Sequence, residues 1–426
     1  MLPPSQGSSA LSATKKILWL EWPRQVSRDE SRSLVVGSAG WTLEAFDIAL
    51  YTLVLARLIR NFTVSSSTAG LLTSLMLVSY GIGGSVFGFV ADRVGRRRAL
   101  MASIVIYLIA TSASAISGTI AILAIFRFVL GMGMGGQWTC GAALIAESWR
   151  PEHRGKALGL MQSSWAIGEI CAAIVAGIFL PRFDWHFVFL VGVVPALVIL
   201  LMQRRVSESP VWESTRTAAR NSFSDSLRLL WRKDLRRNGV IATAMNACSM
   251  FGYWGLFTWI PAYLSLPAAQ GGRGLNLTKT ATWLVAMGIG KWLGYTLFGF
   301  TADSIGRRKS YALYLVAAAI LVPIYGVATT PAWLLAIGPL VAFFGTGYFS
   351  GFGAITSELF PTEVRATAMG ISYNIGRGFS AAAPLAIGFL SRRFGIGPSF
   401  FVLAGAFLLA ALLALALPET KGKKLE

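Results

Sequence analysis

The sequence predicts an all-α membrane protein with twelve transmembrane helices in two pseudo-symmetric bundles of six. Three observations lead to this prediction. The 426 residues are 54% hydrophobic and only 13% charged, whereas a soluble chain carries about 25% charged residues. Apolar runs of about 20 residues, the length that crosses a bilayer as a helix, recur at short intervals. The second half of the chain also repeats landmarks of the first half at a constant spacing.

The apolar runs define two sets of six spans. The first set lies near 34–60, 69–91, 99–117, 120–146, 156–179 and 185–204, and the second near 238–266, 281–302, 310–328, 332–357, 366–390 and 398–417. The predicted organisation is an N-terminal tail (1–33), an N-terminal bundle (34–204), a linker (205–237), a C-terminal bundle (238–417) and a C-terminal tail (418–426). The linker is the long polar connection, and we expect short surface helices in it.

An internal repeat relates the two halves. The segment GFVADRVGRRR begins at Gly88, and GFTADSIGRRK begins at Gly299, 211 positions later. The same shift relates Glu147 to Glu358, Glu152 to Glu363, and Arg154 to Arg365. Halves that repeat in parallel are typical of transporters whose binding site lies between the repeats. The repeat therefore predicts a site at the middle of the membrane.

The distribution of basic residues predicts the topology. Of 38 Lys and Arg, 28 lie in the two tails and in the connections on the side of the tails. Seven lie on the opposite side: Arg57, Arg60, Arg182, Arg273, Lys279, Arg392 and Arg393. This bias follows the positive-inside rule and places both termini in the cytoplasm of a multi-pass protein of the plasma or inner membrane. The net charge of +19 is therefore explained without nucleic acid as a partner.

The sequence shows no arrangement of residues that would predict catalysis or metal binding. The three cysteines lie in apolar runs without metal-ligand spacing, and His153 and His186 sit at span ends, where a solvated loop position is the simpler interpretation than a proton relay. We find no nucleophile elbow and no phosphate-binding loop. Residues 1–33 lack the features of a cleavable signal peptide. We therefore expect a protein that is not an enzyme, binds no cofactor and uses its first span as the insertion signal.

The repeated loop predicts contacts at the cytoplasmic ends of the helices. Its two copies contain Gly88, Asp92 and Arg96, and Gly299, Asp303 and Arg307. The glycines permit close helix approach, and the aspartates can bind helix N-termini and the arginines that follow. We expect Glu147 with Arg154, and Glu358 with Arg365, to join the same charge network. The alternative is that the basic residues act only as topology signals.

Charged residues inside the spans are the main functional candidates, because a charge in the bilayer is costly. The N-terminal half contains Glu44, Asp47, Arg127 and Glu169, and the C-terminal half contains Lys291 and Arg377. A carboxyl group in a dry pocket can load and release a proton near neutrality. A buried guanidinium offers a fork that matches a carboxylate. This asymmetry predicts proton coupling in the first half and capture of an anion in the second.

Asp47 is the first candidate for proton coupling. It lies about 20 Å along its helix from Leu34, which is near mid-bilayer. Glu44 is three residues earlier on nearly the same face, so the two carboxyl groups can share a proton. Arg127 either assists proton transfer or is a structural partner of Asp47. Glu169 faces the cavity or lies at a helix contact. The alternative for both acids of the first span is neutralisation of a base.

Arg377 is the first candidate for binding substrate, with Asn374 one turn away on the same face to add amide hydrogen bonds. Lys291 is either a second cationic contact or an ion-pair partner that a carboxylate releases during transport. The alternative for both cations is a salt bridge across the two halves. Further candidates for the cavity wall are Gln137, Gln162, Trp165, Tyr253, Trp254 and Tyr373. Each of these has a simpler interpretation as a packing or interfacial residue.

These motifs resemble those of the major facilitator superfamily. The repeated loop is similar to the hallmark motif of this superfamily. The segment RFVLGMGMGG, which begins at Arg127, is similar to its span-4 motif. SESPVW after span 6 and PETKG after span 12 resemble the sugar porters and their organic-anion relatives. The resemblance covers nearly all of residues 34–422. It implies twelve helices, alternating access, a cytoplasmic latch made by the loop motif, and an arginine at position 127 that assists proton transfer.

The spacing of Glu44 and Asp47 resembles the D-x-x-D of acid symporters, with Glu in place of the first Asp. TWIPAYL in span 7 also resembles these acid:proton symporters, which include sialate, monocarboxylate and aromatic-acid carriers, and the paired glutamines of sugar porters are missing. We therefore expect proton-coupled symport of a small organic anion by a monomer in the lipid bilayer. The alternatives are a sugar or polyol symporter, an efflux antiporter whose acids bind a cationic drug, and a sensor on the same scaffold.

Overall fold

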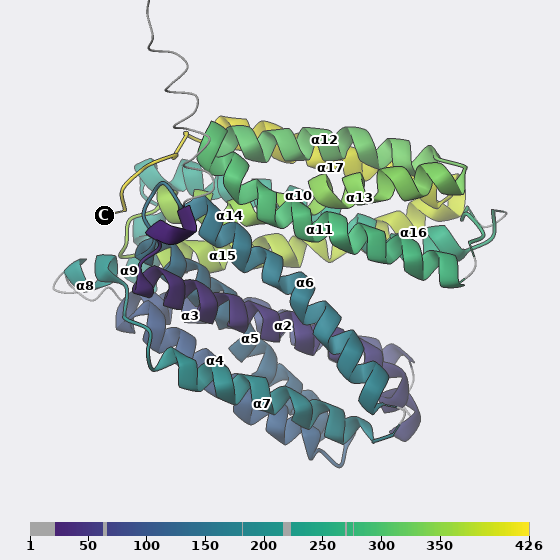
Figure 1. The fold of residues 1–426 in the computed structure, drawn as a ribbon, viewed down its shortest axis with the longest axis horizontal. Helices are drawn as coiled ribbons and strands as arrows, with labels where there is room; N and C mark the ends of the chain where they lie inside the picture. The colour runs from purple at the N-terminus through teal and green to yellow at the C-terminus, as the bar shows by residue number, and fades with distance from the viewer. Residues whose placement is uncertain are drawn as a thin grey trace, which may run out of the picture.

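The computed structural model describes residues 22–62, 66–180, 182–215, 223–268, 271–275 and 277–425. All regular secondary structure in these residues is helical. Eight helices in the described residues are long and apolar enough to cross a membrane, by length and composition. The remaining long segments, α2, α3, α11 and the pair α15–α16, lie alongside them (Figure 1). The twelve-helix architecture that the sequence predicts is confirmed.

The helices follow the repeat. The first bundle contains α2 (Arg28–Asn61), α3 (Ser66–Val94), α4 (Arg96–Ala115), α5 (Ile120–Ser148), α6 (Arg154–Phe179) and α7 (Trp185–Gln203). The linker contains α8 (Pro210–Thr215) and α9 (Phe223–Leu230). The second bundle contains α10 (Lys233–Ser265), α11 (Leu277–Ile305), α12 (Arg307–Val327), α13 (Pro331–Gly347), α14 (Phe349–Leu359), α15 (Arg365–Ser380), α16 (Ala382–Phe394) and α17 (Ile396–Ala416). A short 3-10 turn, η1 (Trp22–Gln25), precedes them.

Helix α2 begins several residues before the predicted first span. The hydroxyl of Ser27 accepts a hydrogen bond from the backbone N–H of Glu30, at 3.1 Å. In return, the Glu30 carboxylate accepts a bond from the backbone N–H of Ser27, at 2.7 Å. This reciprocal capping box satisfies two N–H groups that would otherwise lack partners at a helix start. The sequence S-x-x-E is therefore the start signal of α2, upstream of the apolar run.

The predicted eleventh span is divided into α15 and α16 at Ala381. Pro384 has no backbone N–H, so the hydrogen bond to the carbonyl of Ser380 one turn earlier cannot form. Proline is a common cause of sharp changes in helix direction. The division lies one turn beyond Arg377, so it falls close to the predicted substrate site.

The two bundles lie side by side, with α3, α5 and α6 of the first against α11, α14 and α15 of the second (Figure 1). The start of α2, the helices α8 and α9, and the C-terminus all lie at one end, which we call the tail end (Figure 1). The opposite end is called the far end. The ribbons of the two bundles are close together at the tail end and spread apart towards the far end.

The burial of α6 follows the same gradient. From Ala157 to Ala166 nearly every residue of this helix is buried. Beyond that point, Ile170 is 60% exposed and Ile174 is 54% exposed. The two halves therefore enclose α6 over the tail-end part of its length, whereas beyond it α6 stays packed on its own half, where Ala172 is 0% exposed.

Candidate functional site

An acid and a base from different halves meet near the centre of the molecule. Glu44 on α2 is fully buried, and one carboxylate oxygen accepts a hydrogen bond from the hydroxyl of Tyr80 on α3. The same oxygen lies 4.0 Å from Nη2 of Arg377 on α15. The Arg377 guanidinium also stacks over the Tyr80 ring, 3.9 Å from its centroid. Tyr80 thus positions both charges through a hydrogen bond and a cation–π contact.

Arg377 keeps hydrogen-bonding capacity in this arrangement. Its Nε and Nη1 atoms are buried and have no hydrogen-bond partner in the described residues, and its side chain is 10% exposed. One carboxylate oxygen of Glu44 also has no partner. A guanidinium with two open donors is suited to a second carboxylate, which it can bind through two parallel hydrogen bonds.

Asp47, one turn along α2, lies in a different environment. Its carboxylate pairs with Arg127 on α5 at 2.9 Å, and both side chains are buried. The hydroxyl of Tyr107 donates a longer hydrogen bond to the other oxygen, at 3.4 Å. The guanidinium of Arg127 also lies over the rings of Tyr51 and Phe189, at 4.7 and 4.2 Å from their centroids. This pair lies within the N-terminal bundle, so Asp47 and Arg127 move together if the halves move as rigid bodies.

Arg377 lines a small central cavity between the halves. The lining residues are Trp41, Gln162, Trp165, Met250, Tyr253, Trp254, Tyr295, Phe349, Tyr373 and Arg377. The predicted wall residues Gln162, Trp165, Tyr253, Trp254 and Tyr373 are therefore brought together with the predicted anion ligand. The cavity has a volume of about 20 Å³, which is room for about one water molecule. A substrate would enter only after the halves separate.

Aromatic rings form most of this wall and pack against one another. Trp41 lies 4.7 Å from Trp165, and Trp138 of the N-terminal half stacks on Tyr373 of the C-terminal half at 3.9 Å between ring centroids. Flat apolar surfaces next to one cation suit a ligand with a planar body and a negative group.

Glu169 and Lys291 form a second acid and base near the cavity. Glu169 on α6 accepts a hydrogen bond from the indole of Trp165 at 2.8 Å. The ammonium of Lys291 on α11 lies over the Phe257 and Tyr253 rings, at 4.4 and 5.5 Å from their centroids. Lys291 thus lies behind the wall of the cavity formed by Tyr253.

Two predicted substrate contacts do not line this cavity. Asn374 donates to the backbone carbonyl of Gly370 at 2.7 Å, and its amide packs against Gly84 of the other half. Gln137 is 1% exposed, and a Cβ added to Gly40 would come within 3.7 Å of its amide oxygen. Asn374 sits where Gly84 lets two helices approach closely, whereas the Gln137 amide is buried without a hydrogen-bond partner in the described residues.

The sequence analysis did not select several residues of this site. Trp41, Tyr80, Trp138 and Tyr295 were missed. One signal was available for Tyr295, which follows Lys291 by one helical turn and so shares its face. No comparable signal exists for Tyr80, because its role depends on Glu44 and Arg377, which are far away in the sequence.

The predicted tail-end residues form two ion clusters. We call the first cluster, which contains Asp92, Arg96, Glu147 and Arg365, the α15 latch. Arg96 pairs with Asp92 at 3.0 Å and with Glu147 at 2.9 Å, all within the N-terminal half. Arg365 of the C-terminal half pairs with Glu147 at 2.6 Å.

Asp92 also binds the start of α15. Its carboxylate accepts bonds from the backbone N–H groups of Ala366 and Thr367 at 3.0 and 2.7 Å, and from the Thr367 hydroxyl at 2.6 Å. A carboxylate is favoured there because the first N–H groups of a helix lack partners and carry partial positive charge. The cluster therefore attaches one half to the other at the tail end.

The second cluster, the α6 latch, is the repeat of the first and contains Asp303, Arg307, Glu358 and Arg154. Asp303 accepts bonds from the backbone N–H groups of Gly155 and Lys156 at the start of α6, at 3.2 and 2.9 Å. Arg307 pairs with both acids of its own half. Arg154 of the N-terminal half pairs with Glu358 at 2.9 Å. The two latches are thus related by the 211-residue repeat. The N-terminal half provides three of the four residues in the α15 latch, and the C-terminal half provides three of the four in the α6 latch.

Glycines in the loop motif allow this approach. A Cβ added to Gly88 would lie 2.5 Å from the carbonyl oxygen of Ala366, and one added to Gly299 would lie 2.4 Å from that of Gly155. Such contacts are too short for any side chain. The same helix starts that the aspartates bind therefore pack directly on the two glycines.

The motifs after spans 6 and 12 contribute residues to the latches. The sequence analysis did not predict this role for the two motifs. The hydroxyl of Ser209 in SESPVW donates to Glu147, and the hydroxyl of Thr420 in PETKG donates to Glu358, the latter at 2.6 Å. Ser209 and Thr420 are also related by the 211-residue shift. A test of the repeat at this offset would have found the pair.

His153 distinguishes the two latches. This residue precedes α6, and its Nδ1 lies 3.1 Å from the ammonium of Lys156. Burial, with the positive charge of Lys156, lowers the pKa of His153 below its usual value. The repeat places Val364 and Thr367 at the equivalent positions, so the α15 latch has no counterpart of the His153 and Lys156 pair.

Comparison with known proteins identifies the family to which this architecture belongs. The sequence matches the Major Facilitator Superfamily over residues 38–272 and 264–426. This chain belongs to that superfamily. It is 31% identical over 415 residues to a probable 4-methylmuconolactone transporter of Cupriavidus pinatubonensis, covering 95% of this chain and 94% of the relative. It is 30% identical over 379 residues to the cis,cis-muconate transport protein of Acinetobacter baylyi, covering 87% and 90%.

Among solved structures, this superfamily member is similar to the proton:xylose symporter XylE, with a TM-score of 0.75 and 21% identity over 93% of this chain and 98% of the other. That similarity supports the fold. The superfamily and the named relatives establish that the protein is a multi-pass membrane transporter and not an enzyme.

Proposed function

We propose that this transporter carries a small organic carboxylate together with a proton, by alternating access. The observation that carries the proposal is Arg377, a central cation with two donor nitrogens open and an aromatic wall beside it. A neutral sugar needs no such cation, and a cationic drug would be repelled by it. The named relatives support the same class, because muconate and methylmuconolactone are small unsaturated organic molecules.

In the proposed cycle, substrate and Glu44 compete for Arg377. The carboxylate of the substrate binds the open side of the guanidinium and takes the place of Glu44, which lies only at the limit of an ion pair. An unpaired buried carboxylate is costly, so uptake of a proton by Glu44 would offset that loss. Substrate and proton would then bind together.

Asp47 and Arg127 remain the proposed coupling pair. They are one helical turn from Glu44 and are held within one half, so the charge of Asp47 affects protonation of Glu44. Protonation of Asp47 would free Arg127, and the return of the proton would restore the pair. No cofactor is involved, because the proton itself is the coupling ion.

Alternating access would proceed by opening the two latches. We place the tail end in the cytoplasm of the plasma or inner membrane, as the distribution of basic residues predicts. The closed latches support a state that is shut at the tail end. As the halves rock about the central site, the cross-half pairs of Arg154 and Arg365 would break, and the monomer would release substrate and proton inward.

Uptake into proteoliposomes tests this function. We would compare benzoate-like planar carboxylates, muconate, short aliphatic monocarboxylates, sialic acid and a neutral sugar, each with and without an inward proton gradient. We expect the gradient to accelerate carboxylate uptake and to leave the sugar unaffected. Acceleration of the sugar alone would overturn the proposal in favour of a sugar or polyol symporter. Movement of an organic cation against the gradient would indicate efflux instead.

A further inference from the structure

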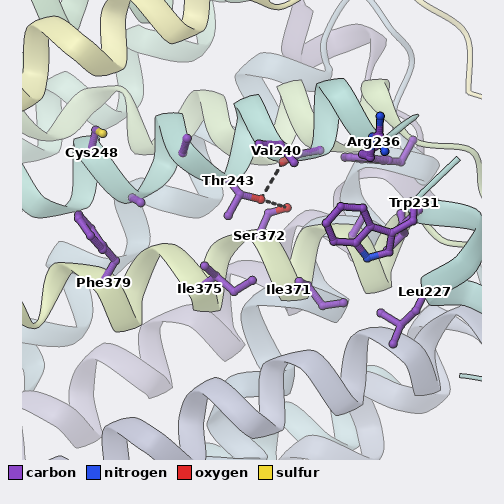
Figure 2. A pocket seen from close by; sticks show the side chains of 16 residues that line it. Leu227, Trp231, Arg236, Val240, Thr243, Cys248, Ile371, Ser372, Ile375 and Phe379 are labelled. Atoms are coloured by element: carbon purple, nitrogen blue, oxygen red, sulfur yellow. Dashed lines mark hydrogen bonds between the residues drawn. The ribbon is translucent and has the colours of Figure 1, made fainter. Parts of the chain in front are cut away.

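A lateral groove, separate from the central cavity, lies between α10 and α15 near the tail end. Its volume is about 510 Å³, within the range of about 300–1,000 Å³ that small-molecule sites occupy. Figure 2 shows that it runs from Trp231 and Leu227 at one end to Cys248 and Phe379 at the other. The transport cycle proposed above does not use it.

Small residues on both helices leave the space between them unfilled. Gly239, Ala244 and Ala247 line the groove from α10, and Ala368 lines it from α15. A Cβ added to Gly239 would meet only the ring of Phe360, at 3.5 Å. The hydroxyls of Thr243 and Ser372 bridge the helices at 3.1 Å (Figure 2).

The equivalent helices of the N-terminal half are packed closely. The repeat relates α10 and α15 to α2 and α6, where the Thr42 hydroxyl donates to the carbonyl of Ser164 at 3.2 Å. A Cβ added to Gly168 would lie 2.2 Å from the Thr42 carbonyl oxygen. The repeat places Phe379, which lines the groove, at the position of Gly168, so the close contact of α2 and α6 at that glycine has no counterpart at this end of the groove.

The walls of the groove are apolar and open to the side of the bundle. Ile375 and Phe379 are 55% and 56% exposed, and Val240 on the facing helix is 55% exposed. In a membrane-spanning bundle, exposed apolar side chains at this depth contact lipid. The surroundings of the groove are therefore hydrocarbon, and an acyl chain is the occupant that fits its walls.

The tail end of the groove has the features of a membrane interface. Leu227 and Leu230 of α9 line the groove, whereas Asp225 and Arg228 of the same helix are exposed and lie 3.7 Å apart. A short helix with one apolar and one charged face lies in the plane of the headgroups. Trp231, which follows it, is 64% exposed, and tryptophan is enriched at this depth.

Positive charge surrounds this end. Between positions 228 and 237 the chain has five basic residues and one acid. Arg236 lines the groove itself, and its guanidinium has no hydrogen bond or ion pair within the part of the chain that the structure describes. Clusters of four to eight basic residues next to a transmembrane helix attract anionic lipid. Arg236 therefore provides a cation for a headgroup at the mouth of an acyl-chain groove.

We propose that this groove binds one anionic phospholipid of the leaflet at the tail end, with an acyl chain between α10 and α15 and the headgroup phosphate on Arg236. The bound lipid fills a space that α2 and α6 close by direct packing in the other half.

Native mass spectrometry of the full chain, released from dodecyl maltoside micelles containing phosphatidylglycerol or phosphatidylcholine, tests this proposal. We expect the wild type to retain one phosphatidylglycerol in preference to phosphatidylcholine. Arg236→Gln should reduce that retention about five-fold, the effect of about one charge near the membrane surface. Lys233→Gln is the matched control, because it removes the same charge from the same segment without lining the groove.

Filling the groove tests the acyl-chain part of the site. Gly239→Leu, or Ala244→Leu if the first variant is less stable in lipid-free detergent, should abolish retention of both lipids. Equal effects of Arg236→Gln and Lys233→Gln would show diffuse electrostatic attraction and overturn the proposal. Unchanged retention in a folded groove-filling variant, equal retention of the two lipids by the wild type, or displacement by inorganic phosphate alone would also overturn it.

Discussion

Of two ion pairs near the middle of the membrane, one lies within a single half and the other connects the two halves. Asp47 and Arg127 pair at 2.9 Å within the N-terminal bundle. Glu44 and Arg377 come from different bundles and lie 4.0 Å apart, with donor nitrogens of the arginine still open. The two acids are three residues apart on α2. A pair inside one rigid half is preserved during rocking, whereas a pair between halves must change.

The tail end repeats this distinction. Arg96 and Glu147 belong to one half, whereas Arg365 reaches the same glutamate from the other half. If each bundle moves as a rigid body, only the cross-half pairs break when the tail end opens. The comparison therefore separates residues that hold a bundle together from residues that set the balance between conformations.

Breaking the pair inside one half should have the largest effect. Asp47→Asn leaves the buried Arg127 without a charged partner, and loss of one member of a buried pair costs about 3–5 kcal/mol. We expect reduced thermal stability in detergent and loss of uptake against a gradient. Asp29→Asn, an exposed change near the start of the same helix, is the control. An Asp47→Asn variant that still concentrates substrate would remove this residue from the coupling site.

Arg377→Gln should weaken substrate binding more than it weakens the fold. Hydrogen bonds to charged groups contribute about 1.5–3 kcal/mol, so we expect about 100-fold weaker binding, measured by titration of the purified protein with the transported carboxylate. Arg393→Gln, near the end of α16, removes the same charge away from the site. Full affinity in the Arg377 variant would contradict its role as the anion ligand.

Glu44→Gln tests the competition between substrate and Glu44. Because the amide no longer competes for Arg377, we expect substrate to bind about tenfold more tightly at neutral pH, equivalent to about 1.4 kcal/mol. Binding should also depend less on pH, because a glutamine at position 44 cannot take up the proton that accompanies substrate. Weaker binding in this variant would instead make Glu44 a direct substrate contact.

A latch substitution should have the smallest effect, a change in the population of conformations. Arg365→Gln removes the pair with Glu147 across the halves and leaves the pair of Arg96 and Glu147 in place, and we expect a shift of about 1 kcal/mol, or about five-fold, towards opening at the tail end. The readout is the alkylation rate of a cysteine introduced at Ala366, with Glu152→Gln as an exposed control. Equal alkylation rates in both variants would mean that the Arg365 pair does not hold the tail end closed.

The repeat identified most residues of the latches, because a repeat is a linear feature. It placed Glu147 with Arg154 and Glu358 with Arg365, whereas in the structure Arg365 binds Glu147 and Arg154 binds Glu358. The shift between the two loop motifs related Asp92 to Asp303. The structure brings the predicted tail-end residues together in two clusters. The central site was predicted less completely. Arg377 and much of its aromatic wall were selected, whereas Tyr80, Trp41 and Trp138 were missed, because their roles depend on contacts between helices distant in the chain.

The sequence by itself determined the class of fold, the number of spans, the repeat and the charges that the membrane interior must accommodate. These follow from composition, spacing and the cost of burying charge, which are local properties of the chain. Only the tertiary structure decided which of those charged residues pair with one another. Glu44 and Asp47 lie on the same helix one turn apart, yet the rotation of α2 between two neighbours directs one towards Arg377 and the other towards Arg127. Helix rotation depends on side-chain packing between distant segments, which a linear pattern does not encode.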